Sequence, residues 1–273
     1  MNFVCPRMTR EMVARDCAAL GVVPGDTVMV HASLRAVGPL LGGPDALIDG
    51  ILAAVGEAGT MLVYLGCPSP YDDLGRGLYS PEDERFIEEH CPPFDPYLTR
   101  ANREFGVLPE FFRGHPRVRC SANAGMRMAA VGARADFLTR DHGPNYGLGE
   151  GSPLARLCEI GGKVLLVGSD LDQVTLLHYA EAVAPIEGKR LAHVRVPVLQ
   201  DGVRTWIEVE EFDTNNNVCD WPDRFFGTIV ERFIAAGLAR SGAIGAAESH
   251  LLPARALVEF AVPIMTATAA QLA

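Results

Sequence analysis

The sequence lacks the long apolar segments and the metal-binding patterns that mark several large classes of protein. No apolar stretch reaches the roughly 18 residues that a membrane-spanning helix needs, and residues 1–15 contain no continuous apolar block of the kind found in secretory signals. The seven cysteines, from Cys5 to Cys219, are scattered and form no CxxC pair, which favours buried, reduced thiols over a zinc site or a redox centre. We therefore expect a cytoplasmic protein with no membrane association and no bound metal.

Positive charge is also scarce. Lys and Arg number 24 against 34 Asp and Glu, which gives a formal net charge of −10. Such a protein repels phosphate backbones, so nucleic acid is not expected as a partner. A small cationic ligand fits this charge better, provided that carboxylates converge on one site.

Three common catalytic motifs are missing as well. GxxxxGK[ST], GxSxG and HExxH do not occur, which argues against a P-loop nucleotide site, a hydrolase nucleophile elbow and a zinc protease. Ser33 follows a predicted strand but has no nucleophile-elbow context, so a serine hydrolase is not predicted. With 48% hydrophobic residues, the 273-residue chain has enough apolar material for a substantial core.

Apolar runs and helical periodicities alternate along the chain. Short buried strands are predicted at 27–30, 60–64, 128–131 and 163–167, and helices at 9–20, 45–55, 107–113, 133–138, 177–184 and 223–236. Residues 192–199 and 203–209 flank Asp201-Gly202, a strong signal for a β-hairpin, whereas 257–262 fit either a strand or a helix. This order predicts one α/β domain over residues 1–273, with an antiparallel hairpin added.

Residues 66–100, called the excursion below, are rich in proline, glycine and charge. We expect little regular structure there, and loops of this length in compact domains are often functional. Carboxylates occur in the excursion at Tyr71-Asp72-Asp73 and after the hairpin at Glu210-Glu211-Phe212-Asp213-Thr214. They could orient an imidazole or bind a cation, although solvated acidic loops explain both patterns equally well.

A polar segment follows directly after the first predicted strand. Residues His31-Ala32-Ser33-Leu34-Arg35 combine backbone N–H groups, a hydroxyl and a guanidinium at a strand exit. This arrangement is suited to a phosphate group. An ordinary surface loop is the alternative reading of the same residues.

Thr175, His178 and Glu181 recur at a spacing of three, which places them on one face of a predicted helix. Asp170 or Asp172 is expected to cap this helix, with His178 in its second turn, where the helix dipole keeps the imidazole neutral. A neutral imidazole can remove a proton from an amine, which amine acylation requires. A half-buried histidine on an amphipathic helix is the alternative that the spacing leaves open.

Taken together, these segments resemble the aminoglycoside 3-N-acetyltransferases, the antibiotic N-acetyltransferase family. The resemblance is collinear over about residues 9–262 and rests on VHASLR with GGP, PPFDP, GEGSPL, TLLHYAE and EFD, at 30–35 with 42–44, 92–96, 149–154, 175–181 and 211–213. Two departures, Leu171 in place of a histidine and Ser121-Ala122-Asn123-Ala124 in place of Ser-x-His-Pro, are typical of the class II and class III branches. The resemblance implies a mixed β-sheet flanked by helices, distinct from the more widespread acetyltransferase fold.

The same resemblance implies roles for individual residues. It implies that acetyl-CoA lies with its pyrophosphate at His31, Ala32, Ser33, Leu34 and Arg35 and with its thioester near Thr175. It implies that His178 is the general base. It also implies that Glu181, Glu211 and Asp213 orient the base or bind substrate ammonium groups. We expect Tyr71, Asp72, Asp73 and Asp172 to bind the substrate as well, and no metal to take part.

The expected reaction is direct transfer of the acetyl group of acetyl-CoA to the 3-amine of an aminoglycoside antibiotic, which confers resistance. Two alternatives remain open. An enzyme of the same fold could acylate another amine or use another acyl-CoA, and a non-catalytic protein could bind coenzyme A or an aminoglycoside. We expect a monomer or a homodimer.

Overall fold

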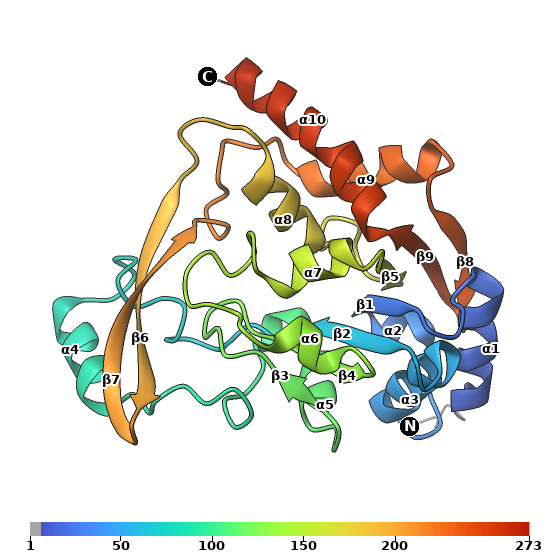
Figure 1. Ribbon diagram of the computed structural model, residues 1–273, viewed down its shortest axis with the longest axis horizontal. Helices are drawn as coiled ribbons and strands as arrows, with labels where there is room; N and C mark the ends of the chain where they lie inside the picture. Colours follow the sequence, from blue (N-terminus) through green and yellow to red (C-terminus); the bar gives the residue numbers. More distant parts are fainter. Residues whose placement is uncertain (1–6, 273) are drawn as a thin grey trace, which may run out of the picture.

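The computed structural model describes residues 7–272 and is built around a seven-stranded sheet (Figure 1). The strands follow the order β3-β4-β2-β1-β5-β9-β8. Their bounds are β1 Thr27–Ala32, β2 Thr60–Tyr64, β3 Arg119–Cys120, β4 Met128–Gly132, β5 Lys163–Val167, β8 Arg240–Ile244 and β9 Ala247–Pro253. The central strand β1 pairs in parallel with β2 and β5, whereas the outer pairs are antiparallel, so the sheet is mixed, as predicted.

Helices cover both faces of the sheet because its central strands are apolar on both sides. In β1, Val28 and Val30 face one core and Met29 faces the other, as the two-residue repeat of a strand requires. The first face carries α1 (Arg10–Leu20), α2 (Leu34–Val37), α3 (Pro44–Val55) and α5 (Leu108–Arg113). The second carries α6 (Ala135–Thr139), α7 (Pro153–Glu159), α8 (Leu176–Val183), α9 (Phe225–Ala235) and α10 (Ala254–Leu272). The α/β class is therefore confirmed.

Local signals in the sequence account for many of the element boundaries. The side chain of Thr9 accepts a hydrogen bond from Met12 N and begins α1, and Gly21, with φ of 108°, ends it. The predicted hairpin is present as β6 (Leu191–Gln200) and β7 (Val203–Phe212). Asp201 and Gly202 both have positive φ, 52° and 79°, which is the backbone that a two-residue hairpin turn requires.

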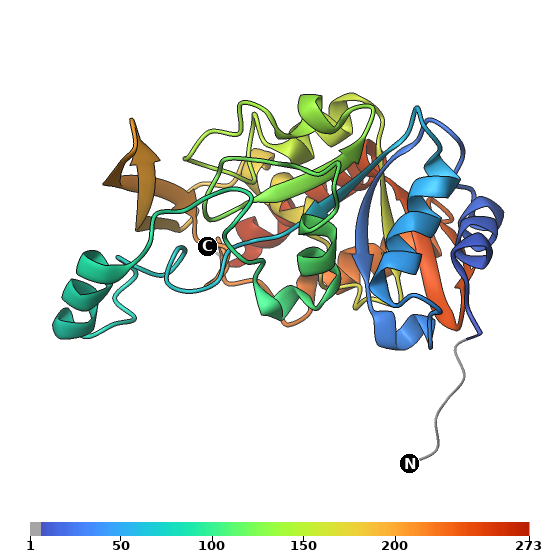
Figure 2. The ribbon, with the colours of Figure 1, turned by 90° about the horizontal axis from the view of Figure 1, so that it is seen from below.

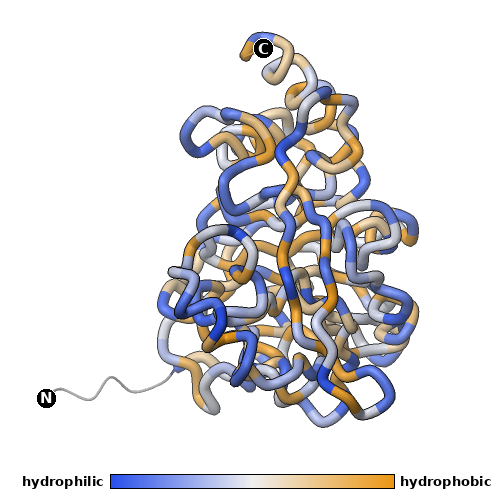
Figure 3. Tube along the Cα trace, turned by 90° about the vertical axis from the view of Figure 1, so that its left-hand side faces the viewer, coloured by the Kyte–Doolittle hydropathy of each residue, from blue (hydrophilic) through white to orange (hydrophobic). Residues whose placement is uncertain are grey.

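The excursion and the hairpin pack together into a separate part of the molecule, called the arm below. Both extend on the side away from α1 (Figure 2). Their shared core includes Cys67, Tyr71, Phe94, Val194 and Val196. The hairpin strands run side by side along this face and alternate between hydrophilic and hydrophobic residues (Figure 3). Phe94 N also donates to Pro197 O at 2.6 Å, which joins the excursion to β6.

The excursion is more regular than predicted. It contains helix α4 (Pro81–His90), and a single 3-10 turn, Arg103–Phe105, follows it. The side chain of Ser80 caps α4 and Pro81 occupies its first turn, followed by three acidic residues. These are strong helix-start signals, so the prolines of this segment border a helix rather than prevent one.

The C-terminal part contains elements that periodicity did not reveal. Strands β8 and β9 occupy 240–253, and 257–262 belongs to the long helix α10. Six cysteines are free, five of them buried and Cys219 half-buried, whereas Cys5 and the first six residues lie outside the described range. None of the helices between residues 7 and 272 has the length and apolar character needed to cross a membrane.

Candidate active site

A cavity of about 260 Å³ lies at the C-terminal ends of the parallel strands. The ends of β1 and β2 contribute five of its lining residues, Val30, His31, Ala32, Val63 and Tyr64. The remaining walls come from the loop before α8, from His178, from the 3-10 turn with α5, from Leu148 and from the segment after β7. Ligands of open α/β sheets characteristically bind outside the carboxyl ends of the strands, so this cavity is the candidate active site.

His178 lines the cavity and is held from behind by a buried carboxylate. Its Nδ1 lies 2.6 Å from Glu181 Oε2, and Glu181 is only 2% exposed. The other carboxylate oxygen of Glu181 accepts a hydrogen bond from Trp221 Nε1 at 2.5 Å. The edge of Phe226 packs against the imidazole, with the ring centroids 4.9 Å apart.

These contacts determine what His178 can do chemically. Because Glu181 is a hydrogen-bond acceptor when ionised, Nδ1 carries the proton and the lone pair is on Nε2. A neutral ring of this tautomer can accept a proton at Nε2, and the carboxylate then stabilises the imidazolium. Glu181, rather than Glu211 or Asp213, is therefore the carboxylate that holds the imidazole.

The start of α8 differs in detail from the prediction. The helix begins at Leu176, so His178 lies in its first turn, and Thr175 precedes the helix without a capping hydrogen bond from its side chain. Neither predicted aspartate caps α8. Asp170 pairs with Arg224, and Asp172 Oδ1 accepts from Gly227 N at 2.7 Å. Their oxygens brace the loop against the start of α9, while Asp172 and Thr175 both line the cavity.

Two side chains on the cavity wall lack partners. His31 Nε2 and Ser169 Oγ are buried and form no hydrogen bond with any residue of the described chain. Burial lowers the pKa of His31 to about 4, so its ring is neutral at physiological pH. Buried polar atoms are normally satisfied, so these two are available for a ligand in the cavity.

The remaining residues of the predicted phosphate segment lie beyond the cavity lining. Ser33 begins the short helix α2, where its Oγ accepts from Ala36 N at 3.4 Å, and Ser33 N donates to Val167 O. Leu34 is half-buried and packs against the first core. Arg35 is exposed and forms no ion pair within the part of the chain that the structure describes.

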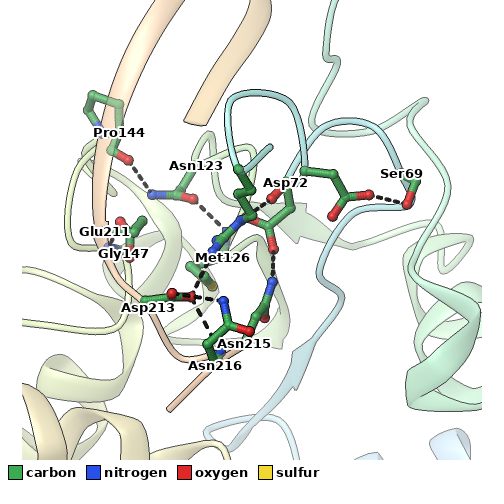
Figure 4. Close-up of polar contacts among 12 residues, drawn as sticks. Ser69, Asp72, Asn123, Met126, Pro144, Gly147, Glu211, Asp213, Asn215 and Asn216 are labelled. Carbon is green, nitrogen blue, oxygen red and sulfur yellow. Dashed lines mark hydrogen bonds and ion pairs between the residues drawn. The ribbon is translucent and has the colours of Figure 1, made fainter. Parts of the chain in front are cut away.

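A cluster of charged side chains lies where the excursion meets the end of β7 (Figure 4). Arg76 is at its centre, with its Nη1 2.8 Å from Asp213 Oδ1 and its Nη2 3.3 Å from Asp72 Oδ1. Asn216 Nδ2 donates to Asp213 Oδ2 at 2.9 Å, and Asn215 Nδ2 lies 3.5 Å from Asp72 Oδ2. Because Asn215 also lines the cavity, the cluster borders the candidate active site.

Glu211 is buried beside this cluster. Its Oε1 accepts a hydrogen bond from Gly147 N, and among the described residues the carboxylate hydrogen-bonded to His178 is Glu181 rather than Glu211. Burial raises the pKa of Glu211 to about 8, and the negative charge of Asp72 adds to the shift. Burial also raises the pKa of Asp72, against the opposing effect of Arg76.

The other predicted substrate residues of the excursion are engaged elsewhere. Tyr71 is buried in the core of the arm, and its hydroxyl donates to Pro92 O at 2.9 Å. Asp73 Oδ2 accepts from Ser69 Oγ and from Tyr79 Oη. Neither side chain lines the cavity, because both hold the excursion in its own conformation.

Several residues of the site carry no signal that spacing could reveal. Trp221 reaches Glu181 from the segment before α9, 40 residues along the chain, and Arg76 reaches Asp213 across 137 residues. Ser169 follows Gly168 at the end of β5, and its position at a strand end is only a weak indication of a functional residue. Only the scarcity of tryptophan, two in the chain, singles out Trp221.

Known proteins resemble this chain in both sequence and fold. The chain is 42% identical to the aminoglycoside N(3)-acetyltransferase III of Serratia marcescens, and the match covers 93% of this chain and 96% of the relative. A solved structure of AAC-IIIb in binary complex with CoASH is 45% identical, with a TM-score of 0.90 over 95% of this chain and 97% of the other. A structure of AAC-VIa bound to sisomicin is 36% identical, with a TM-score of 0.89 over 97% and 99%.

These similarities define the protein as an acyltransferase of mixed α/β fold. The sequence model for aminoglycoside 3-N-acetyltransferases matches residues 29–266. The chain belongs to the aminoglycoside 3-N-acetyltransferase family.

Proposed function

We propose that this enzyme transfers the acetyl group of acetyl-CoA directly to the 3-amine of an aminoglycoside, with His178 as the general base. The observation that carries the proposal is the hydrogen-bonded chain from Trp221 through Glu181 to His178, whose free Nε2 belongs to a cavity wall. Amine acylation needs a base because an ammonium group has no lone pair for attack.

The chemical step follows from this geometry. Nε2 of His178 takes a proton from the substrate nitrogen as that nitrogen forms a bond to the thioester carbonyl carbon. The carbon–sulfur bond breaks, and the coenzyme A sulfur leaves and takes up the proton. Glu181 stabilises the imidazolium between these events because its carboxylate lies 2.6 Å from Nδ1. General base catalysis of this kind contributes roughly 10²–10⁴-fold.

The acetyl-CoA side of the cavity is assigned to the end of β1. His31 Nε2 and Ser169 Oγ are buried polar groups without partners in the described chain, and a bound thioester or amide could satisfy them. Arg35, exposed beyond the cavity, is free to pair with a phosphate. The relative in complex with CoASH supports coenzyme A as the carrier.

The aminoglycoside side is assigned to the charged cluster. Asp72 and Asp213 place carboxylates beside the cavity, and Glu211, whose pKa burial raises to about 8, can release its proton when a cation binds beside it. Such groups favour a polycation over a neutral sugar. The sisomicin-bound relative supports the substrate class. Asp172 and Thr175 line the cavity together with His178.

Turnover with defined substrates tests this function. The enzyme is incubated with acetyl-CoA and sisomicin, and released thiol and acetylated product are measured. Activity with another amine but not with sisomicin would favour an N-acyltransferase that acts on a different substrate. Binding of coenzyme A or sisomicin without turnover would favour a non-catalytic protein. His178→Ala should lose about 10²-fold or more in kcat with little change in acetyl-CoA affinity, because removing a base costs rate rather than ground-state binding.

A further inference from the structure

The guanidinium of Arg76 lies among the carboxylates assigned to the cationic substrate. Its side chain is only 6% exposed, compared with 19% for Asp72 and 14% for Asp213. Besides the two ion pairs, Arg76 Nε donates to the main-chain oxygen of Asp72 at 2.6 Å. Each of its nitrogens therefore has a protein acceptor, and no rearrangement of the side chain is needed to satisfy it.

We propose that Arg76 is a fixed counter-charge in the aminoglycoside site and a specificity-determining residue of the enzyme. It occupies the position between Asp72 and Asp213 where a substrate ammonium group would otherwise bind. The proposal rests on the proposed function, because it assigns the substrate class to the same cluster. Arg76 repels a substrate ammonium group from the position between the two aspartates, so the drug presents a hydroxyl group at that position and its ammonium groups to the outer oxygens of Asp72 and Asp213.

The placement of the guanidinium favours this role over that of a latch for the excursion. The turn that carries Arg76 is held independently, since Arg195 N donates to Leu74 O at 2.8 Å and Tyr71 is buried in the arm core. The outer oxygens of the two aspartates accept only from amide side chains, those of Asn215 and Asn216, which are exposed. Without Arg76, both carboxylates would therefore be available to a cation arriving from the cavity side.

The test compares neomycin with paromomycin, which differ by one amine in place of a hydroxyl. Their dissociation constants are measured by calorimetry with the coenzyme A-saturated enzyme at low ionic strength. Arg76→Gln keeps a hydrogen-bonding side chain but removes the positive charge. It should shift the affinity ratio about tenfold towards neomycin, because the additional ammonium group of neomycin is no longer repelled by the guanidinium. High salt should reduce this shift.

Two variants separate charge from packing. Arg76→Lys keeps the positive charge but not the planar, two-pronged guanidinium group, so its ratio of affinities for the two drugs should remain that of the parent enzyme. Arg195→Gln removes an arginine of the same arm that pairs with Glu84 and Glu88, away from the cluster, and should also leave the ratio unchanged. Melting temperature and coenzyme A affinity report whether each variant is folded.

Three results would overturn the proposal: an unchanged ratio in Arg76→Gln, an equal loss of affinity for both drugs, or the same shift in Arg76→Lys as in Arg76→Gln. If Arg76→Gln does not fold, Arg76→Lys still decides, because a changed ratio with the charge retained contradicts the proposal and an unchanged ratio supports it. Failure of the proposed function is a separate result, namely that the parent enzyme acetylates none of the aminoglycosides.

Discussion

Replacing Glu181 with glutamine tests the catalytic assignment most directly. The change removes one charge and keeps the side-chain shape. Glu181 now accepts two hydrogen bonds, from His178 Nδ1 and from Trp221 Nε1. The two donors approach different oxygens of the carboxylate, and an amide has only one oxygen, so in this geometry it cannot satisfy both donors. If that oxygen accepts the hydrogen bond from Trp221, the amide NH₂ group donates to Nδ1 of His178. The neutral imidazole then carries its proton on Nε2, so Nε2 can no longer accept a proton from the substrate.

The size of the effect follows from the burial of this pair. Glu181 is 2% exposed, so its carboxylate acts on the imidazolium with little screening by water. In the proposed transition state this carboxylate faces an imidazolium, and removing one partner of a buried ion pair costs about 3–5 kcal/mol. At about 1.4 kcal/mol for each tenfold change in rate, Glu181→Gln should lower kcat by roughly 10²–10⁴-fold.

Steady-state kinetics with a thiol reagent measure this effect, and calorimetry with coenzyme A checks that the cofactor site is intact. Trp221→Phe is the matched control, because it removes one donor to Glu181 and leaves the bond to His178 in place. It should cost about tenfold, the lower end of the range for one hydrogen bond to a charged group. A folded Glu181→Gln enzyme that keeps more than about a tenth of the parent kcat would refute the reasoning, since base catalysis contributes far more than that.

Three further predictions concern binding and stability. Arg35→Ala should weaken acetyl-CoA several-fold and leave aminoglycoside affinity nearly unchanged in separate titrations, whereas equal losses would argue against a phosphate contact. Aminoglycoside affinity should fall as salt rises, more steeply for drugs with more amines, and a flat salt series would contradict the acidic site. Glu211→Gln should match the parent in melting temperature below about pH 4.5 and exceed it above about pH 8. The raised pKa of Glu211 means that the folded parent holds the proton more tightly, so it loses stability as pH rises through this window; a constant difference would contradict that.

The sequence predicts the central layer of the fold well because its signals are local. β2 and β5 have the predicted bounds, and α1 and the hairpin lie within two or three residues of theirs at each end. Each rests on apolar runs, caps or turn residues that act over a few positions. Strands β8 and β9 were not predicted, because β8 is largely exposed and its burial pattern lacks the alternation that marks a half-buried strand. The pairing of β9 with β5, and of β8 with β9, is a tertiary effect.

The candidate site likewise combines local features that the sequence predicts with long-range contacts that it does not. The spacing of Thr175, His178 and Glu181 predicts a shared helical face, and the bond between His178 and Glu181 agrees with it. The contacts of Trp221 and Arg76 depend on how distant segments meet, which no local pattern encodes. The acidic segments were visible as sequence, but their convergence depends on the packing of the excursion against the hairpin.

Several ionisable and polar groups that are costly to bury line this cavity or lie close to residues that line it. Glu181 and Glu211 are 2% and 3% exposed, and His31 and Ser169 have buried atoms without partners in the described chain. Folding alone does not favour such an arrangement, because desolvated polar groups lower stability unless they are paired. In the proposed mechanism, Glu181 recovers the free energy lost on burial when His178 becomes positively charged, and Glu211 when a cation binds beside it. These carboxyl groups, which are costly to bury, are therefore satisfied in that mechanism by a ligand or a transition state of opposite charge, and the two unpaired polar atoms by hydrogen bonds to a ligand.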